Sequence, residues 1–224
     1  MSSKQFTQSS VLSTFYSAQA APRKATALLM TEPSKLETDL TIIGSFVVGM
    51  WLLWFLSSVV TGGMIAKELS LRPRESMSPL NFIAYPFIHF TFAHVAGNTI
   101  PFAVLGWLVM LTSTLNFWIV TVVTIISNGL GTWLLGTPQS RHAGASGLVL
   151  GYYGFLVANL FFDGSLNAFL LILLTLIVGS FYGGFLRQIL PTREGISTSG
   201  HFFGFVGGIA AAYLLHILPT IGGL

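Results

Sequence analysis

Residues 40–65 read LTIIGSFVVGMWLLWFLSSVVTGGMI and contain no charged side chain. A helix that crosses the hydrocarbon core of a bilayer needs about 20 consecutive, predominantly apolar residues, so this stretch predicts a membrane-spanning helix. Five further apolar runs follow it, at 93–112, 116–136, 146–162, 166–189 and 201–218. We therefore expect an all-α membrane protein built as a bundle of six transmembrane helices.

The composition of the whole chain agrees with this class. Of its 224 residues, 53% are hydrophobic and only 8% are charged, and the mean hydropathy is +0.77. Soluble domains carry about 25% charged residues. The absence of cysteine excludes disulfide and thiolate chemistry, and five histidines without cysteine argue against a structural zinc site, so we expect no cofactor. A net charge of only +3, with the basic residues near membrane edges, argues against nucleic-acid binding.

The chain divides into a polar tail, residues 1–39, and a membrane domain, residues 40–224. The tail is rich in Ser and Thr and is predicted to be a disordered cytoplasmic segment, with a cleaved organelle transit peptide as the alternative. We expect a multi-pass integral membrane protein. A bacterial or archaeal plasma membrane is favoured, with an organelle membrane as the alternative. The orientation stays open, because the loops that would lie outside carry more basic residues than the tail does.

Two connections differ from simple loops. Residues 67–92 are long, semi-apolar and broken by three prolines, which predicts an interfacial segment rather than a spanning helix. Residues 137–145 are polar and lead directly into the short fourth run. Irregular backbone at membrane depth is tolerated only where it lines a water-filled cavity, so we expect Ser146 at the bottom of a wet pocket. Its expected lining is Thr137, Gln139, Ser140 and His142.

Two polar side chains stand at the start of apolar runs. Ser146 lies in Gly-Ala-Ser-Gly at 144–147, and His201 lies in Gly-His-Phe-Phe-Gly at 200–204. Polar groups at membrane depth are costly and tend to be functional. A serine nucleophile needs a base, and histidine commonly serves, so the pair predicts a Ser–His dyad.

Helix packing is the competing interpretation of both motifs. Small residues follow each one at helical spacing, and such stripes let two membrane helices approach closely. The two interpretations agree with each other, because close packing of the fourth and sixth helices would bring Ser146 and His201 together. The stripes are Gly147, Gly151 and Gly154, and then Gly204, Gly208 and Ala212.

A third motif is His94-Val95-Ala96-Gly97-Asn98. His94 and Asn98 share one helical face, and both side chains can donate hydrogen bonds. Donors aimed at the oxyanion of a tetrahedral intermediate contribute on the order of 3 kcal/mol each. We expect both to face the cavity at Ser146, with inter-helix hydrogen bonding as the alternative.

The remaining histidines carry weaker predictions. For His89, Arg141 and His142 a surface position is favoured. The alternatives are that His89 supports the loop by hydrogen bonding, and that Arg141 and His142 touch substrate or the rim of the pocket. His216 is expected at the opposite membrane face. No carboxylate is placed to complete a triad, since Asp163 is also predicted on the opposite face. A Ser–His dyad is chemically adequate without one.

Together, these motifs resemble those of the rhomboid family of intramembrane serine proteases, over about residues 40–220. The resemblance implies a six-helix rhomboid-like core without cofactor. It implies Ser146 as nucleophile, His201 as general base and acid, and His94 and Asn98 at the oxyanion hole. It also implies single-pass transmembrane proteins as substrates, cleaved within the lipid bilayer.

The chain also departs from the family pattern. Leu150 stands where an aromatic ring often packs under the catalytic histidine, and residues 67–92 lack the Trp-Arg motif of many members. Tyr152 or Tyr153 could take the place of that ring. The alternative function is an inactive relative that binds membrane-protein clients. A small transporter or channel fits poorly, because the fourth and sixth runs contain no acidic residue at mid-membrane depth.

Overall fold

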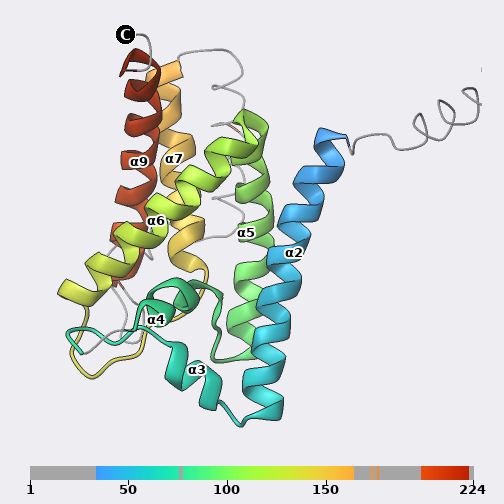
Figure 1. Cartoon of the computed structure of the whole chain (residues 1–224), viewed down its shortest axis with the longest axis vertical. Coiled ribbons are helices and arrows are strands. Elements are labelled where there is room, and N and C mark those ends of the chain that lie inside the picture. Colours follow the sequence, from blue (N-terminus) through green and yellow to red (C-terminus); the bar gives the residue numbers. More distant parts are fainter. Residues whose placement is uncertain (1–33, 76–77, 164–172, 174–175, 177–197, 222–224) are drawn as a thin grey trace, which may run out of the picture. The chain divides into compact units, whose positions relative to one another are not determined.

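The structure is a computed structural model that describes residues 34–75, 78–163 and 198–221, with residues 173 and 176. Residues 39–224 belong to one compact unit and Met1–Thr38 to another. The described residues are helical, with no strand beyond one isolated bridge, so the prediction of an all-α membrane protein is confirmed. The elements are α2 (Lys35–Phe55), η1 (Leu56–Val60), α3 (Met64–Leu69), α4 (Pro79–Ala84), η2 (Tyr85–Phe87), α5 (Phe92–Thr112), α6 (Thr114–Leu135), α7 (Ser146–Asp163) and α9 (Thr198–Ile221) (Figure 1).

Four of the predicted spans are long and apolar enough to cross a membrane: Lys35–Val60, Phe92–Thr112, Thr114–Leu135 and Ser199–Leu218. The fourth predicted span forms the shorter apolar helix α7. The chain is therefore a multi-pass membrane protein. The fifth predicted span, 166–189, lies outside the described residues, so the count of six stays a prediction.

The end of the first span was predicted wrongly. The helix stops at Val60 rather than Ile65, because Gly62 and Gly63 adopt φ of +58° and +89°. Such a left-handed backbone is readily available to glycine and cannot continue a right-handed helix. Ile65 belongs to the separate helix α3.

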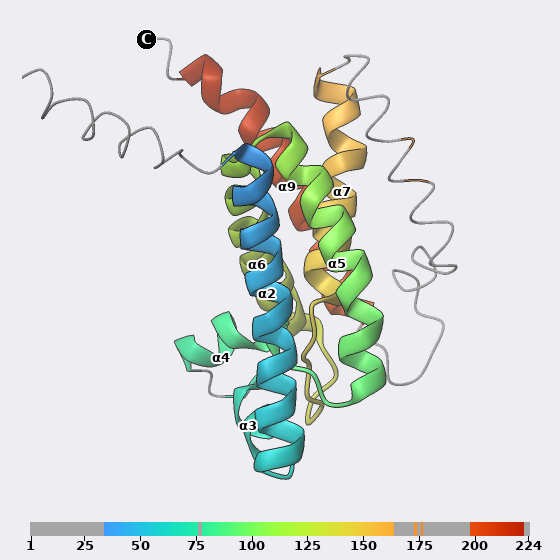
Figure 2. The same ribbon diagram turned by 90° about the vertical axis from the view of Figure 1, so that its right-hand side faces the viewer.

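Helix α7 is the centre of the bundle and packs against α5, α6 and α9. Residues 147–156 of α7 are all buried, and nearly all of them are apolar. Figures 1 and 2 both show α9 running alongside α7. The glycine stripes make this possible: a methyl group added to Gly208 would collide with the carbonyl of Gly151. The packing interpretation of the two stripes is thus confirmed.

The connection between the first two spans folds over the connection that precedes α7. It contains α3, α4 and η2 and no spanning helix, as predicted. Leu71 exchanges two backbone hydrogen bonds of 2.9 Å with His142, which forms the isolated antiparallel bridge. The Arg74 guanidinium donates to the Gly136 carbonyl at 2.9 Å. Residues 71–74 therefore fasten the loop from which α7 begins.

Candidate active site

Ser146 and His201 meet where their helices begin. Ser146 is the first residue of α7, and His201 lies in the first turn of α9, at the same end of the bundle (Figure 1). His201 Nε2 and Ser146 Oγ are 2.8 Å apart, a hydrogen-bond distance. The histidine is buried and the serine is half-buried. The structure thus brings together the two residues that the sequence singled out, although 55 positions separate them.

The backbone just before Ser146 is held by the segment between the first two spans. Besides the bridge at His142, the Gly144 N–H donates to the Tyr85 carbonyl at 2.9 Å. The Ala145 N–H donates to His89 Nε2 at 3.4 Å. Three of the four residues that precede the serine are therefore fixed by hydrogen bonds. These hydrogen bonds therefore hold the backbone of the nucleophile in position.

His89 is fully buried, so the expected surface position was wrong. Its Nδ1 lies 3.2 Å from the Phe87 carbonyl, which can only accept, so Nδ1 is assigned the proton and Nε2 the acceptor role toward Ala145. Burial and, to a smaller extent, the neighbouring His94 lower the pKa of His89 to about 3. The ring is therefore neutral at physiological pH, the form that this pair of hydrogen bonds requires.

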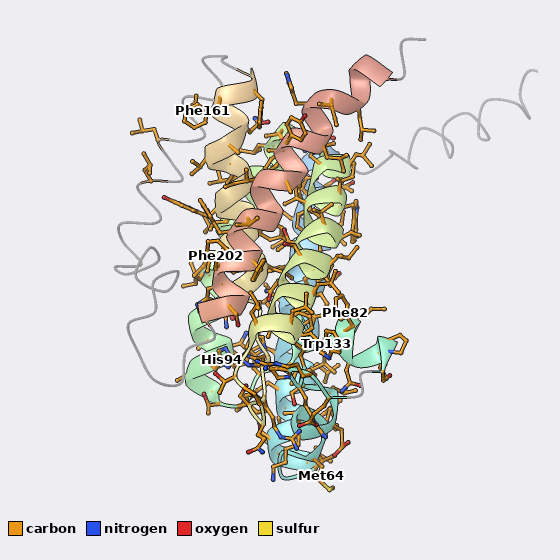
Figure 3. All side chains as sticks on the ribbon, turned by 90° about the vertical axis from the view of Figure 1, so that its left-hand side faces the viewer. Met64, Phe82, His94, Trp133, Phe161 and Phe202 are labelled. Atoms are coloured by element: carbon orange, nitrogen blue, oxygen red, sulfur yellow. The ribbon has the colours of Figure 1, made fainter. Side chains whose placement is uncertain are left out.

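His94 packs against the same loop. Gly144 has a φ of +110°, and a methyl group added there would run into the His94 imidazole. The His94 and His89 rings meet edge to face with centroids 4.9 Å apart. In Figure 3, His94 lies at about the same height along the molecule as the beginning of α9. The histidine thus lies beside the residues that position the nucleophile.

Asn98 is buried one turn further along α5. Its side-chain amide donates one hydrogen bond to the His94 carbonyl at 3.0 Å. Neither Asn98 nor His94 is among the residues that line the cavity at Ser146, so their place at the oxyanion stays a prediction. The i, i+4 spacing that put them on one face also lets Asn98 bond to its own helix.

A small polar cavity of about 20 Å³ adjoins the Ser146–His201 pair. A buried water needs about 10–15 Å³ of such space, so the cavity has room for one. Of the four lining residues predicted from the sequence, only His142 lines it. The side chains of Tyr85, Asn128 and Thr132 complete the polar wall.

Sequence reasoning missed Asn128 and Thr132. Both are buried on α6, and Thr132 Oγ1 donates to Asn128 Oδ1 at 3.1 Å. The Asn128 amide nitrogen lies against Gly147, the residue after the serine. Their spacing could have indicated a shared role, since two polar residues four apart lie on one face of an otherwise apolar helix. Buried polar groups require hydrogen-bond partners.

His142 is the second histidine of the cavity. Its Nε2 lies 2.7 Å from Ser140 Oγ, and the side chain is half-buried rather than exposed as predicted. Burial lowers the pKa of His142, and the nearby His201 lowers it further. Arg141 is exposed, in agreement with the prediction for it.

The two tyrosines considered as substitutes for an aromatic ring at Leu150 have separate roles. Tyr152 faces α6, where its hydroxyl lies 2.9 Å from Thr121 Oγ1. The rings of Tyr153 and Phe205 are 6.1 Å apart, so Tyr153 packs on α9 one turn beyond His201. Leu150 is itself fully buried. Within the described part of the chain, no group of three or more His, Asp or Glu residues is placed to hold a metal ion.

The chain is also similar in sequence to known proteins. A family model described as the Rhomboid domain matches residues 77–218, more than half of the chain. Uncharacterized proteins of Mycobacterium tuberculosis and Mycobacterium bovis are each 38% identical over 154 residues, covering 65% of this chain and 62% of the relative. An uncharacterized protein of Mycobacterium leprae is 36% identical over 139 residues, covering 58% of this chain and 53% of the relative. The chain thus spans less than two thirds of the length of these relatives.

Proposed function

Because this chain belongs to the rhomboid family, we propose that it is an intramembrane serine endopeptidase that cleaves membrane-spanning proteins with a Ser146–His201 dyad. The observation that carries this proposal is the 2.8 Å contact between Ser146 Oγ and His201 Nε2. A base within hydrogen-bond reach of a serine hydroxyl is the geometric signature of an activated nucleophile. The single-pass substrates are inferred from the family and from the position of the site among membrane helices.

The dyad supports acylation in two proton transfers. His201 Nε2 accepts the hydroxyl proton as Ser146 Oγ bonds to the carbonyl carbon of the scissile peptide. The protonated imidazole then gives that proton to the amide nitrogen as the C–N bond breaks. The new amino terminus leaves, and the other half of the substrate remains as an ester on Ser146.

The tetrahedral oxyanion has donors close to the nucleophile. Ser146 begins α7, so its N–H has no acceptor within its own helix and lies at the positive end of the helix dipole. Asn98 uses one amide hydrogen on the His94 carbonyl, and an amide has a second one to offer. We propose that this second hydrogen is donated to the oxyanion when substrate binds. Catalytic hydrogen bonds commonly tighten only in the substrate complex.

Deacylation requires one water beside the acyl-enzyme. The cavity lined by Asn128, Thr132 and His142 has the volume and the polar groups for that water. His201 would accept its proton as the water oxygen attacks the ester carbonyl. The proton then returns to Ser146 Oγ as the acyl bond breaks, which regenerates the hydroxyl.

Labelling with a fluorophosphonate probe tests the nucleophile separately from any choice of substrate. We expect the wild type to be labelled at Ser146, and the Ser146→Ala variant to remain unlabelled. Ser140→Ala is the matched control, because its hydroxyl also contacts a histidine, His142 at 2.7 Å, in the loop before α7. Labelling that is absent from the wild type, or that persists in Ser146→Ala, would instead indicate an inactive relative or another nucleophile.

A further inference from the structure

An apolar cleft of about 360 Å³ separates α2 from the α4 and η2 segment. In Figures 1 and 2, α4 lies at the same height as the second half of α2. The lining is almost entirely hydrocarbon, and its polar part is negligible. The residues on the α2 side include Phe46, Gly49, Met50 and Leu53, and those on the facing side include Ile83 and Phe87.

The cleft has a firm inner wall. Met50 is fully buried at its base. Phe46 stacks on Phe87 with ring centroids 5.5 Å apart, which closes one side. Phe46 also contacts Phe102 of α5 and Phe117 of α6. The wall is therefore continuous with the hydrophobic core and cannot simply collapse into the space.

The two helices that bound the cleft also carry apolar side chains that are exposed. Val48 and Leu52 on α2 are 65% and 53% exposed, and Leu80 and Ile83 on α4 are each 60% exposed. Gly49 lies near the middle of the span Lys35–Val60. Large apolar side chains exposed at that depth face bilayer hydrocarbon, so the cleft is continuous with the lipid-facing surface.

We propose that this cleft binds the acyl chain of a bilayer lipid. Protein interiors tolerate few voids larger than a water molecule, because the lining atoms lose their dispersion contacts. Water is a poor filler where there are almost no polar partners. A helix from a substrate or a second copy is rigid and about 10 Å across, so it fits this cleft less well than a single chain of methylenes. An acyl chain is thin, flexible and present at that depth.

Two glycines of α2 provide a matched test. Gly49 lines the cleft, and a side chain added there starts with no atom within 4 Å. The Gly49→Leu variant should therefore fill the space without displacing the wall. Gly44 also has nothing within 4 Å of an added side chain, and it does not line the cleft. Gly44→Leu brings the same gain in helix propensity and the same added hydrocarbon on the same helix.

The experiment uses the detergent-solubilised full chain, stripped of bulk lipid and titrated with a phosphatidylcholine that carries a photoreactive diazirine on one acyl chain. We expect saturable labelling of peptides that contain residues 45–53 or 80–87. This labelling should be lost in Gly49→Leu and retained in Gly44→Leu. Added phosphatidylcholine should also raise the Tm of the wild type and of Gly44→Leu, but not that of Gly49→Leu.

The lipid-free Tm of Gly49→Leu shows whether that variant is folded, and we expect it at or above the wild-type value, because a void has been filled. Three results would overturn the proposal: labelling of these peptides that never saturates, saturable labelling that survives in Gly49→Leu, and equal loss in both variants.

Discussion

Gly204 of α9 lies directly against the backbone carbonyl of Gly147 of α7, with no room for a methyl group between them. Gly147 follows the nucleophile and Gly204 lies one turn beyond His201, so this contact sets the separation of the two helices at the dyad. Packing and chemistry therefore depend on the same residues.

Replacing Gly204 with alanine should force α9 away from α7. Overpacking of a well-packed site typically costs about 1–3 kcal/mol, so we expect a lower Tm. Peptidase activity should fall further than stability alone explains, because the 2.8 Å contact between His201 and Ser146 would lengthen. Gly97→Ala on α5 is the control, since an added methyl group there meets nothing within 4 Å. Unchanged Tm and activity in Gly204→Ala would show that the helices can separate at no cost.

Asn98→Ala tests the proposed oxyanion donor. Removing one such donor costs about 10²–10³ in kcat, so we expect a loss of about a hundredfold with little change in KM. The measurement is steady-state cleavage of a membrane-spanning substrate in detergent. Unaltered turnover would leave Asn98 with its structural bond to the His94 carbonyl and no other role.

His89 should make stability depend on pH. Burial lowers its pKa to about 3 in the folded protein, whereas an unfolded histidine titrates near 6.5. The unfolded chain therefore binds the extra proton first, and the stability contributed by the neutral ring is lost as the pH falls from about 6.5 toward 3. We expect the wild-type Tm to fall across that window.

The matched comparison is His89→Gln against His142→Gln. Glutamine can still accept a hydrogen bond from the Ala145 N–H, but it does not titrate. His89→Gln should have a flatter Tm profile than the wild type between pH 6.5 and 4. Burial also lowers the pKa of His142. The Tm profile of His142→Gln therefore shows how much of the pH dependence of the Tm comes from His142 and not from His89. Parallel profiles for the wild type and His89→Gln would assign the acid sensitivity elsewhere.

Asn128→Leu should slow deacylation more than acylation. Leucine has a similar volume but leaves the cavity beside Ser146 without one of its polar walls. Quenched-flow analysis should show the acyl-enzyme accumulating, because the water that resolves it is no longer held. Its Tm is the check on folding, since Thr132 also loses its bond to Asn128 Oδ1. A uniform decrease in both steps would argue against a role in placing water.

Sequence reasoning was most successful where hydrophobicity and residue size decide the structure. Apolar runs of spanning length located four spans and α7, and the glycine stripes gave the α7–α9 contact. It failed at Gly62 and Gly63, where a turn cuts short an uninterrupted apolar run. A hydropathy pattern does not show where the backbone turns, so it could not locate the end of the helix.

The polar contacts of the site were harder to predict. His89 and His142 lie in connections that were expected at the surface, and only the folded chain shows that Leu71, Tyr85 and His89 bond to the loop before Ser146. Asn128 enters the site from a helix that carries no motif. These pairings join residues far apart in sequence, and local spacing carries no information about them.

The central claim is tested most directly by reconstituting the purified protein in liposomes with a single-pass transmembrane substrate and measuring cleavage. The wild type should release two fragments whose new termini lie within the spanning segment. Ser146→Ala and His201→Ala should each reduce the rate to background, while both retain the wild-type Tm. Cleavage by Ser146→Ala at the wild-type rate, or no cleavage of any membrane-spanning substrate by a folded wild-type protein, would contradict the account.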